Sequence, residues 1–437
     1  MSKITMNKTK IVVKSTEETM SIQADVCVVG AGVSGFMAAL QVARLGKKVV
    51  LADSSYTFGG QATNSMIGLF CGLYSRTNPN YLFTYGIVEE MLRDLEKSGG
   101  LYFREAEAAT CIAFDEQTLL EWIEDNVLKE KVVPLIGACI DEVRVKDRRI
   151  SDVVFNTKYG KVKVNAISYV DATGDASLTY LAGLPCRVSD IGPVYGSQMV
   201  IIENIDFDKL PEESIVNETL KKEGHLFGLE RRDGLIFCFP RKNRIIVNMT
   251  HVETPLDPLG TSVSSIIGKQ RAKRVVDFLK AKFPDALGNS TIHAYGQLGS
   301  RQTRWIVGRK QLIADDIRNG VKFDDAIART TWPIELHNTM ESYQWEVFGK
   351  EHVHYVPFSA MTPPDIDNLI AAGRCIDSDL IALSSVRVMG PCMAMGIAAA
   401  HALDLAGSGS VHEIDIKQLQ ERLSDNLERK DPLHFGK

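Results

Sequence analysis

Two arginines three residues apart could bind a negatively charged group. Arg301 and Arg304 would share one face of a helix, because residues three or four apart are neighbours on a helical surface. Two guanidinium groups on one face can clamp a carboxylate or stabilise another negative charge. The alternative is a surface pair bonded to Asp315 or Asp316. Because arginine seldom lies beside an apolar residue such as Trp305 without a partner, we favour the binding role.

A histidine further along the chain could transfer a proton. His337 alternates with Glu335 on a segment expected to be extended, so the two side chains should point the same way. The ordinary pKa of histidine lies close to neutral pH, which suits general acid–base catalysis. The alternative is a buried histidine with only structural hydrogen bonds. Together with the two arginines, His337 completes the predicted catalytic set. His352 and His354 lack an apparent third ligand, so no metal site is expected.

A glycine-rich turn near the N-terminus has the spacing of a dinucleotide-binding loop. It reads Gly30-Ala-Gly32-Val-Ser-Gly35. Gly30 allows a tight turn, Gly32 lets the backbone approach a pyrophosphate, and Gly35 lets the following helix pack on the preceding strand. The helix N-terminus then offers N–H groups and the positive end of its dipole to phosphates. Asp53 follows at a spacing that suits an acid bound to ribose hydroxyls.

The residues around this loop predict the elements that position it. Residues 25–30 are apolar and rich in β-branched types, which is typical of a strand buried on both faces. Residues 33–45 change to helical spacing, and residues 48–52 form a second apolar strand. Strand, helix and strand in this order predict a parallel sheet. Antiparallel strands are predicted within residues 138–170, and a further buried strand over residues 368–373.

Three later segments favour FAD over NAD as the nucleotide. The glycine pair Gly59-Gly60 lies within reach of the same phosphates, and a simple NAD dehydrogenase does not need it. Residues 170–175 read as a strand ending in a turn, as in the second crossing of flavin folds, although alone they could be an ordinary turn. A small-residue helix is predicted from Pro391, which a first helical turn tolerates. Its dipole would stabilise charge on the flavin pyrimidine carbonyl, and the same residues also suit a close-packed structural helix.

With these motifs, the chain resembles FAD-dependent oxidoreductases that are distantly related to the fumarate reductase and succinate dehydrogenase flavoproteins. The resemblance runs from residue 24 to residue 406 and rests on ordered motifs, found at residues 30–35, 59–63, 171–175, 298–308 with 324–337, and 368–400. It implies FAD, bound covalently or not, an inserted substrate domain and a wide range of substrates. Cys71 could be a covalent flavin tether or a small buried side chain.

The chain also departs from this family at two places. Gln302 and Trp305 occupy positions where relatives usually have Glu and Arg, so the usual polar contacts there are in doubt. Phe358-Ser359 replaces a Tyr-Arg pair, which suggests a smaller or less polar substrate. The predicted cofactor-binding residues are Gly30, Gly32, Val33, Ser34, Gly35, Asp53, Ser54, Gly59, Gly60, Gln61, Ala62, Thr63, Ile140, Ala172, Thr173, Gly174, Gly373, Arg374, Asp377, Arg387, Cys392, Met393 and Gly396.

Length and composition set the remaining expectations. The 437 residues exceed one ordinary core, so we expect two domains. With the strand–helix–strand unit described above, the expected fold is α/β. It consists of a Rossmann-like FAD-binding domain with a parallel sheet (22–185 and 356–437) and an inserted α+β substrate domain (186–355). A net charge of -5 and the absence of Lys/Arg runs argue against nucleic acid. The eight cysteines form no C-x-x-C pair, which favours reduced thiols in a cytoplasmic protein. The N-terminal residues include no apolar core of signal-peptide length, so no leader is expected. The apolar run 388–403 is short and interrupted, so a buried helix is expected, not a membrane span.

The motifs together predict an enzyme in which FAD accepts hydride from a small organic substrate and passes electrons to an unknown acceptor. One alternative is a flavin reductase supplied by NAD(P)H, although no second glycine-rich βαβ unit is present. Others are a non-redox flavoprotein, such as a hydratase or isomerase, and a subunit of an electron-transfer complex whose iron–sulfur centres lie on another chain. A homodimer is a further expectation.

Overall fold

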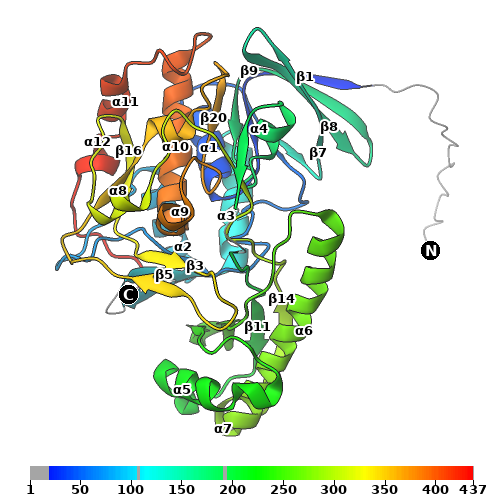
Figure 1. The fold of residues 1–437 in the computed structure, drawn as a ribbon, viewed down its shortest axis with the longest axis vertical. Helices are drawn as coiled ribbons and strands as arrows, with labels where there is room; N and C mark the ends of the chain where they lie inside the picture. The colour runs from blue at the N-terminus through cyan, green and yellow to red at the C-terminus, as the bar shows by residue number, and fades with distance from the viewer. Residues whose placement is uncertain (1–18, 106–108, 190–193, 437) are drawn as a thin grey trace, which may run out of the picture.

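A mostly parallel seven-stranded sheet forms the centre of the upper lobe in the computed structural model, which describes residues 19–105, 109–189 and 194–436 (Figure 1). Its order is β6-β2-β1-β9-β8-β7, and β20 also pairs with β9. All pairs are parallel except β7–β8 and β8–β9. The strands are β1 (Met20–Val29), β2 (Val49–Asp53), β6 (Val133–Ile136), β7 (Cys139–Lys146), β8 (Arg149–Thr157), β9 (Gly160–Asp171) and β20 (Leu369–Ala371).

Two helices from opposite ends of the sequence cover one face of this sheet. Helix α1 (Val33–Arg44) follows the glycine turn, and α10 (Met389–Ala406) packs beside it (Figure 1). A Cβ atom at Gly396 would lie 2.1 Å from the carbonyl oxygen of Ser34, so the absence of a side chain permits this contact. Helix α10 is long and apolar enough to cross a membrane, but 78% of it is buried inside the protein, as expected for a core helix.

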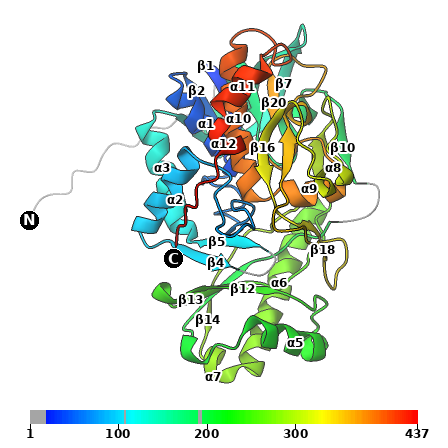
Figure 2. The ribbon, with the colours of Figure 1, turned by 90° about the vertical axis from the view of Figure 1, so that its left-hand side faces the viewer.

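A second sheet forms the lower lobe (Figures 1 and 2). It is antiparallel, in the order β12-β13-β11-β14, and its core also includes helices α5, α6 and α7. Along β12 the side chains alternate: Ile236 belongs to that helical core, whereas Phe237 belongs to a cluster shared with the upper lobe. The elements are β11 (Val200–Glu203), α5 (Glu213–Glu223), β12 (Leu235–Phe239), β13 (Arg244–Asn248), α6 (Pro258–Lys282), α7 (Pro284–Leu287) and β14 (Thr291–Tyr295).

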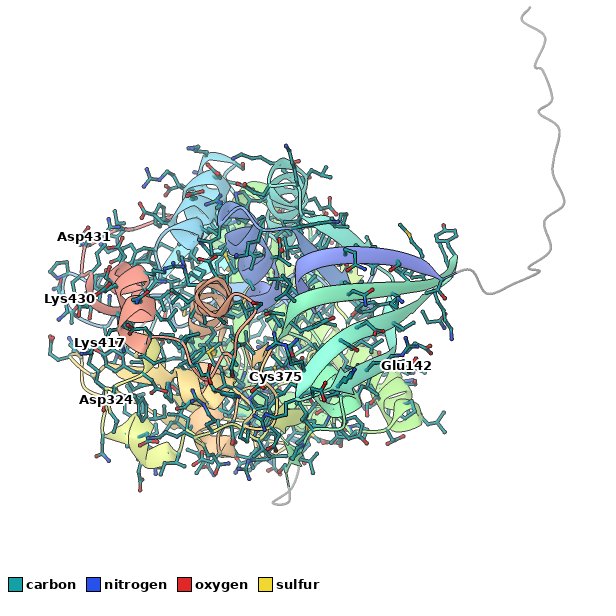
Figure 3. The ribbon with its side chains drawn as sticks, turned by 90° about the horizontal axis from the view of Figure 1, so that it is seen from above. Glu142, Asp324, Cys375, Lys417, Lys430 and Asp431 are labelled. Carbon is teal, nitrogen blue, oxygen red and sulfur yellow. The ribbon has the colours of Figure 1, made fainter. Side chains whose placement is uncertain are left out.

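Smaller elements connect the two lobes and complete the edges. Seen from above, β7, β8 and β9 project to one side, where Glu142 lies, and Cys375 is nearer the centre (Figure 3). Strands β3, β4 and β5 form a three-stranded sheet, and three two-stranded pairs are β10–β15, β16–β19 and β17–β18. Their bounds are β3 (Leu69–Phe70), β4 (Leu101–Glu105), β5 (Thr110–Phe114), β10 (Cys186–Val188), β15 (Arg304–Ile306), β16 (Ala326–Thr330), β17 (Ile334–Leu336), β18 (Gln344–Glu346) and β19 (His354–Pro357). The remaining α-helices are α2 (Ile87–Lys97), α3 (Glu116–Lys129), α4 (Ser177–Leu181), α8 (Ala314–Arg318), α9 (Leu380–Val386), α11 (Ile416–Arg422) and α12 (Ser424–Glu428).

These observations confirm the predicted α/β class and its parallel sheet. The boundaries 22–185, 186–355 and 356–437 stay a prediction. The leader expectation concerns residues 1–18, which lie outside the described residues. One local prediction is wrong: Arg304 opens strand β15, and no helix contains Arg301. Residues 301–303 lie in a bend before this strand. The two guanidinium groups bind different partners, Tyr195 and Ser197 for Arg301 and Asp175 for Arg304, so the predicted pair does not form.

Candidate active site

One cavity of about 770 Å³ extends from the glycine turn toward the sheet of the lower lobe. It opens beyond the carboxyl ends of parallel strands β1, β2 and β9, where ligands bind in folds of this kind. Most of the residues predicted to bind the cofactor line it. They are Gly30, Gly32, Val33, Ser34, Asp53, Ser54, Gly59, Gly60, Gln61, Ala62, Ile140, Ala172, Thr173, Gly174, Gly373, Arg374, Arg387 and Cys392.

The first glycine turn leaves space where a phosphate could approach the backbone. Gly30 has a φ of 99°, and a Cβ there would lie 2.3 Å from the carbonyl oxygen of Ala172. Gly32 differs, since the nearest atom to its Cβ position is the Gly60 Cα at 4.0 Å. Gly32 also caps α1 without a side-chain hydrogen bond. The first N–H groups of the helix therefore remain available to an anion.

Asp53 is held at the end of β2 with both carboxylate oxygens bound to backbone amides. Ala31 N donates to Oδ2 at 2.6 Å, and Ser55 N donates to Oδ1 at 2.7 Å. Burial raises the pKa of Asp53, while these two hydrogen bonds oppose the rise. The carboxylate lines the cavity beside Ser54 and Ile140. It retains acceptor capacity for ribose hydroxyls, since a carboxylate has about four acceptor positions.

A second helix N-terminus and an arginine border the middle of the cavity. The N-terminal residue of α10, Met389, lines it, and the N-cap of this helix also has no side-chain hydrogen bond. Arg374 donates to Asp175 Oδ1 at 2.7 Å and to Thr303 Oγ1 at 3.2 Å. Burial acts to raise the pKa of Asp175, but the charge of Arg374 and the hydrogen bonds from Thr303 and Arg374 together lower that pKa. The Gly32 opening, Asp53 and two helix N-termini without side-chain caps together fit a long dinucleotide such as FAD.

Beyond the α10 terminus the cavity becomes apolar and aromatic, with two arginines at its wall. Arg301 donates to the Tyr195 carbonyl oxygen at 2.5 Å and to Ser197 Oγ at 2.9 Å, and Arg387 donates to the Glu335 carbonyl oxygen at 3.2 Å. Within the described ranges, neither arginine forms an ion pair with a carboxylate. Burial, followed by the charge of Arg387, lowers the pKa of Arg301. The chamber residues that sequence reasoning did not identify are Met199, Leu235, Phe237, Asn248, Trp332, Tyr343, Trp345 and Cys111.

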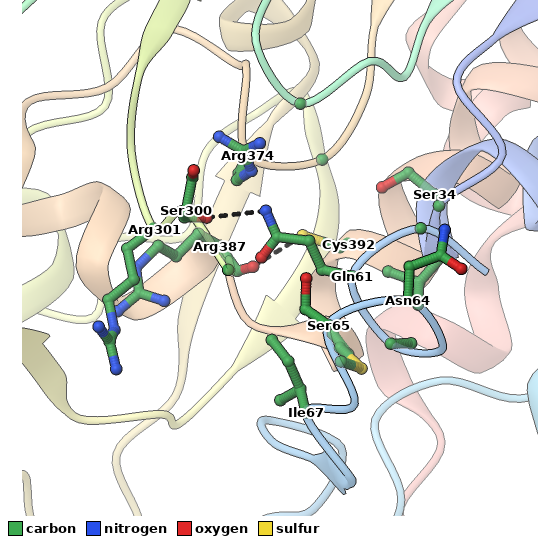
Figure 4. A pocket seen from close by; sticks show the side chains of 18 of the residues that line it. Ser34, Gln61, Asn64, Ser65, Ile67, Ser300, Arg301, Arg374, Arg387 and Cys392 are labelled. Carbon is green, nitrogen blue, oxygen red and sulfur yellow. Dashed lines mark hydrogen bonds between the residues drawn. The ribbon is translucent and has the colours of Figure 1, made fainter. Parts of the chain in front are cut away.

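The close view shows how these groups are arranged (Figure 4). Arg301, Arg374 and Arg387 lie on one side of the pocket, and Ser34 and Asn64 lie on the other. The side-chain amide of Gln61, a predicted cofactor residue, lies between the two sides and donates to the Ser300 carbonyl oxygen at 2.9 Å. These three guanidinium groups therefore place positive charge on this side of the pocket, whereas a fourth lining arginine, Arg104, pairs with Glu213 at 2.8 Å.

A chain of hydrogen bonds leads from this cavity into the protein through His337. His251 Nδ1 lies 3.0 Å from the Met340 carbonyl oxygen, which can only accept, so this nitrogen carries a proton. Burial lowers the pKa of His251, so the ring is neutral and its Nε2 accepts from His337 Nδ1 at 2.8 Å. His337 Nε2 lies 2.8 Å from Glu335 Oε1, and this contact must contain one further proton. Glu335 lines the cavity, so a proton is held at its wall.

The predicted catalytic residues have three different positions. Arg301 lines the cavity as expected. The guanidinium of Arg304 lies 3.8 Å from the ring centre of Tyr180 and donates to the Asp175 carbonyl oxygen, so it does not line the cavity. His337 is buried behind Glu335. The two side chains point the same way, as predicted, and contact each other. His337 therefore does not line the cavity and is connected to it through the Glu335 carboxyl group.

Five predicted cofactor residues also lie outside the cavity lining. Gly35 packs so closely on the glycine turn that a Cβ would lie 1.7 Å from the Gly30 carbonyl oxygen, and Gly396 packs on α1. Thr63 Oγ1 donates to the Phe58 carbonyl oxygen within its own loop. Asp377 pairs with Arg187 at 2.9 Å, and Met393 is fully buried. These residues stabilise the walls instead of facing the cavity. In the part of the chain that the structure describes, no group of three His, Cys, Asp or Glu residues could hold a metal ion.

The fold and the cavity define a dinucleotide-binding flavoprotein of the Rossmann-like class. Residues 25–423 match the family model described as FAD dependent oxidoreductase. The chain belongs to this FAD-dependent oxidoreductase family, and its cofactor is FAD. The prediction of an FAD-dependent oxidoreductase is thus confirmed at the level of the family, whereas the finer relation to fumarate reductase-type flavoproteins stays a prediction.

Individual relatives are more distant. The chain is 26% identical over 136 residues to the thiamine thiazole synthase of Pyrococcus horikoshii, covering 31% of this chain and 48% of that protein. The thiamine thiazole synthase of Methanococcus aeolicus is 27% identical over 181 residues, covering 39% of this chain and 63% of that protein. The chain thus matches less than two thirds of the length of either protein. Among solved structures, a geranylgeranyl bacteriochlorophyll reductase-like protein from Thermoplasma acidophilum is 13% identical (TM-score 0.49, covering 93% and 84% of the two chains). The flavin-dependent brominase Bmp2 is 11% identical (TM-score 0.48, covering 92% and 83%).

Proposed function

We propose that the protein transfers hydride between FAD and a small anionic organic substrate, and that Arg301 and Arg387 bind the anion. The observation that carries this proposal is the presence of two largely buried guanidinium groups at one cavity wall, neither of which forms an ion pair with a described carboxylate. Burying a charge without a partner is costly, so an incoming anion compensates it. A carboxylate has the shape and charge that a guanidinium binds best.

The chain's own residues divide the remaining tasks. FAD, when bound, supplies the hydride chemistry. Trp332, Tyr343 and Trp345 contact the apolar body of the substrate and exclude water, which strengthens the charge interactions at the arginines. Glu335 exchanges the proton that accompanies hydride transfer, and His337 shares that proton behind it. The anion, the apolar chamber and the proton donor therefore meet at one end of the cavity.

A test of the anion proposal compares acids with their uncharged derivatives. Anaerobic bleaching of the flavin band would be recorded for hydroxy acids, amino acids and their methyl esters. We expect bleaching by acids only. Arg301→Ala should weaken acid binding by roughly 10- to 100-fold, because a hydrogen bond to a charged group contributes about 1.5–3 kcal/mol. The control Arg318→Ala removes an exposed arginine that pairs with Glu346 and should change binding less than twofold. Equal bleaching by acids and esters would contradict the proposal.

A second candidate is the reductive direction, which the shared proton favours. The Glu335–His337 contact holds a proton at rest, and loss of that proton leaves a carboxylate near two arginines. A group in this state is better prepared to donate a proton than to accept one, and reduction of a substrate double bond requires such a donor. Anaerobic bleaching by NADPH, with reoxidation by an unsaturated acid, would favour this direction. Turnover without any flavin spectral change would instead indicate a hydratase or isomerase.

A further inference from the structure

Two cysteines face each other across the short sheet that borders the cavity. Strand β3 pairs with β5 in the register Leu69↔Ala113 and Phe70↔Ile112, so the next pair along is Cys71 and Cys111. The pair before Leu69↔Ala113 contains a hydrogen bond, since Phe114 N donates to the carbonyl oxygen of residue 68. Hydrogen-bonded and non-bonded pairs alternate, which makes the cysteine pair a non-bonded one, with Cα atoms typically about 4.5 Å apart. A disulfide spans about 4.4–6.8 Å between Cα atoms.

Both cysteines also line the cofactor cavity at the α10 end. The Cys71 carbonyl oxygen accepts from Gly390 N at 2.9 Å, which joins this cysteine to the first turn of α10. Cys392 lines the same region, but its thiol donates to the carbonyl oxygens of Val386 and Arg387 and has no facing cysteine in the sheet. Cys71 and Cys111 are therefore placed to form a disulfide with each other beside the expected position of the flavin.

The surroundings of Cys71 favour its protonated thiol over the thiolate. A hydrogen bond with Cys111, and then burial, raise the pKa of Cys71 well above its ordinary value. A protonated thiol reacts slowly with oxidants and disulfides in solution. Burial of Cys111 also limits access from solvent. An oxidant bound inside the cavity does not meet this barrier, because both cysteines line the cavity.

We propose that Cys71 and Cys111 form a redox-active pair that exchanges two electrons with bound FAD. Oxidation breaks two S–H bonds and forms one S–S bond, and FAD takes up both electrons and both protons to become FADH2. The reverse step breaks the S–S bond and restores both thiols and oxidised FAD. The inference needs FAD binding but no carboxylate substrate, so it goes beyond the proposed function.

Peptide mass spectrometry tests the pair directly. Fully reduced apoprotein would be incubated with excess FAD without oxygen, then denatured, alkylated and digested. We expect free thiols to fall from the eight cysteines of the chain to six, with the Cys71 peptide linked to the Cys111 peptide and the absorbance of the flavin band lowered by one equivalent of FAD per chain. Cys71→Ser and Cys111→Ser should each keep all seven remaining thiols. The control Cys238→Ser removes a half-buried strand cysteine outside the cavity and should lose two of its seven.

Three results would overturn the proposal. These are eight alkylated thiols in protein that carries a bound-flavin spectrum, a link between other cysteines, or flavin attached to Cys71. The wild-type peptide masses decide the question even where a serine variant fails to fold. A bound-flavin spectrum shows that the cofactor site works, so failure of the disulfide proposal can be told apart from failure to bind FAD. The comparison of acids with esters tests the substrate proposal separately.

Discussion

At the scale of single residues, the position of one proton couples the charge of the cavity to the protein interior. The carbonyl oxygen of Met340 fixes the tautomer of His251, which in turn fixes that of His337. The remaining proton can lie only between His337 and Glu335. Glu335 Oε2 also accepts from Trp332 Nε1 at 3.1 Å, so the carboxyl group is oriented from both sides. The two histidines lie behind Glu335, and the carboxyl group faces the cavity.

Replacing this carboxyl group by an amide should separate binding from proton transfer. Glu335→Gln keeps the size of the side chain and a hydrogen-bonding contact to Trp332, but it cannot release a proton. We expect flavin reduction or reoxidation by substrate to slow by roughly 10²–10⁴-fold, with substrate affinity changed only a few-fold, and with the pH dependence of that step lost. Rapid-mixing absorbance measurements across pH values check this outcome. The control Glu346→Gln alters a surface carboxylate paired with Arg318 and should leave the rate intact; an unchanged pH profile in Glu335→Gln would refute the assignment.

A buried histidine away from the cavity should make stability depend on pH. Burial, and then His352, lower the pKa of His354 to about 3, and its Nε2 lies 2.9 Å from Ser385 Oγ. The unfolded chain binds a proton near the ordinary value, so stability is fully present above about pH 6.5 and falls as the pH drops toward the folded pKa. In this window His354 alone should change the free energy of unfolding by about 1.4 kcal/mol per pH unit. Urea unfolding between pH 6.5 and 4.5 should show that slope reduced by this amount in His354→Gln and unchanged in His225→Gln, an exposed control.

At the scale of elements, prediction succeeded where neighbouring residues determine the structure. The glycine turn, the strand before it and α1 are contiguous, so their spacing alone specifies the βαβ unit and the position of Asp53. The spacing of Arg301 and Arg304 predicts a shared face only for a helical segment. The segment instead enters β15, whose pairing with β10 comes from a part of the chain more than one hundred residues away. Local periodicity carries no signal for such a pairing.

The contact between α1 and α10 makes a specific prediction about Gly396. Alanine normally favours a helix interior over glycine by about 1 kcal/mol. Here a Cβ would lie 2.1 Å from the Ser34 carbonyl oxygen, so one helix must move. Gly396→Ala should therefore destabilise the protein by about 1–3 kcal/mol in urea unfolding and weaken FAD binding, because both helix N-termini border the cavity. Gly349→Ala, with no atom within 4 Å of its Cβ position, is the control. Stabilisation by Gly396→Ala would show that the helices are less closely packed than described.

At the scale of the whole molecule, one half of the cavity could be predicted from the sequence and the other could not. The cofactor half is built from loops with diagnostic glycines. The half that we propose for the substrate includes β12, where Ile236 and Phe237 are both apolar although they face opposite sides of the sheet. An apolar alternation without a polar face does not indicate which side meets the upper lobe. Trp332, Tyr343 and Trp345 likewise become neighbours of Phe237 only when the chain has folded back over the sheet.

Because the cofactor cavity joins segments from the beginning, middle and end of the chain, FAD should stabilise the whole fold. A ligand that binds only the folded state stabilises it by about 2.7 kcal/mol at one hundred times its Kd. For a chain of this length that energy corresponds to a rise in Tm of roughly 3 °C, and the rise should grow with FAD concentration. FMN is the matched control, because it lacks the adenosine half that Asp53 and the N-terminus of α1 are arranged to bind. Thermal unfolding followed by circular dichroism should thus show little effect of FMN at the same concentration. An equal rise with both flavins would mean that the glycine turn contributes no binding energy, and the assignment of that end of the cavity to the adenosine half would have to be abandoned.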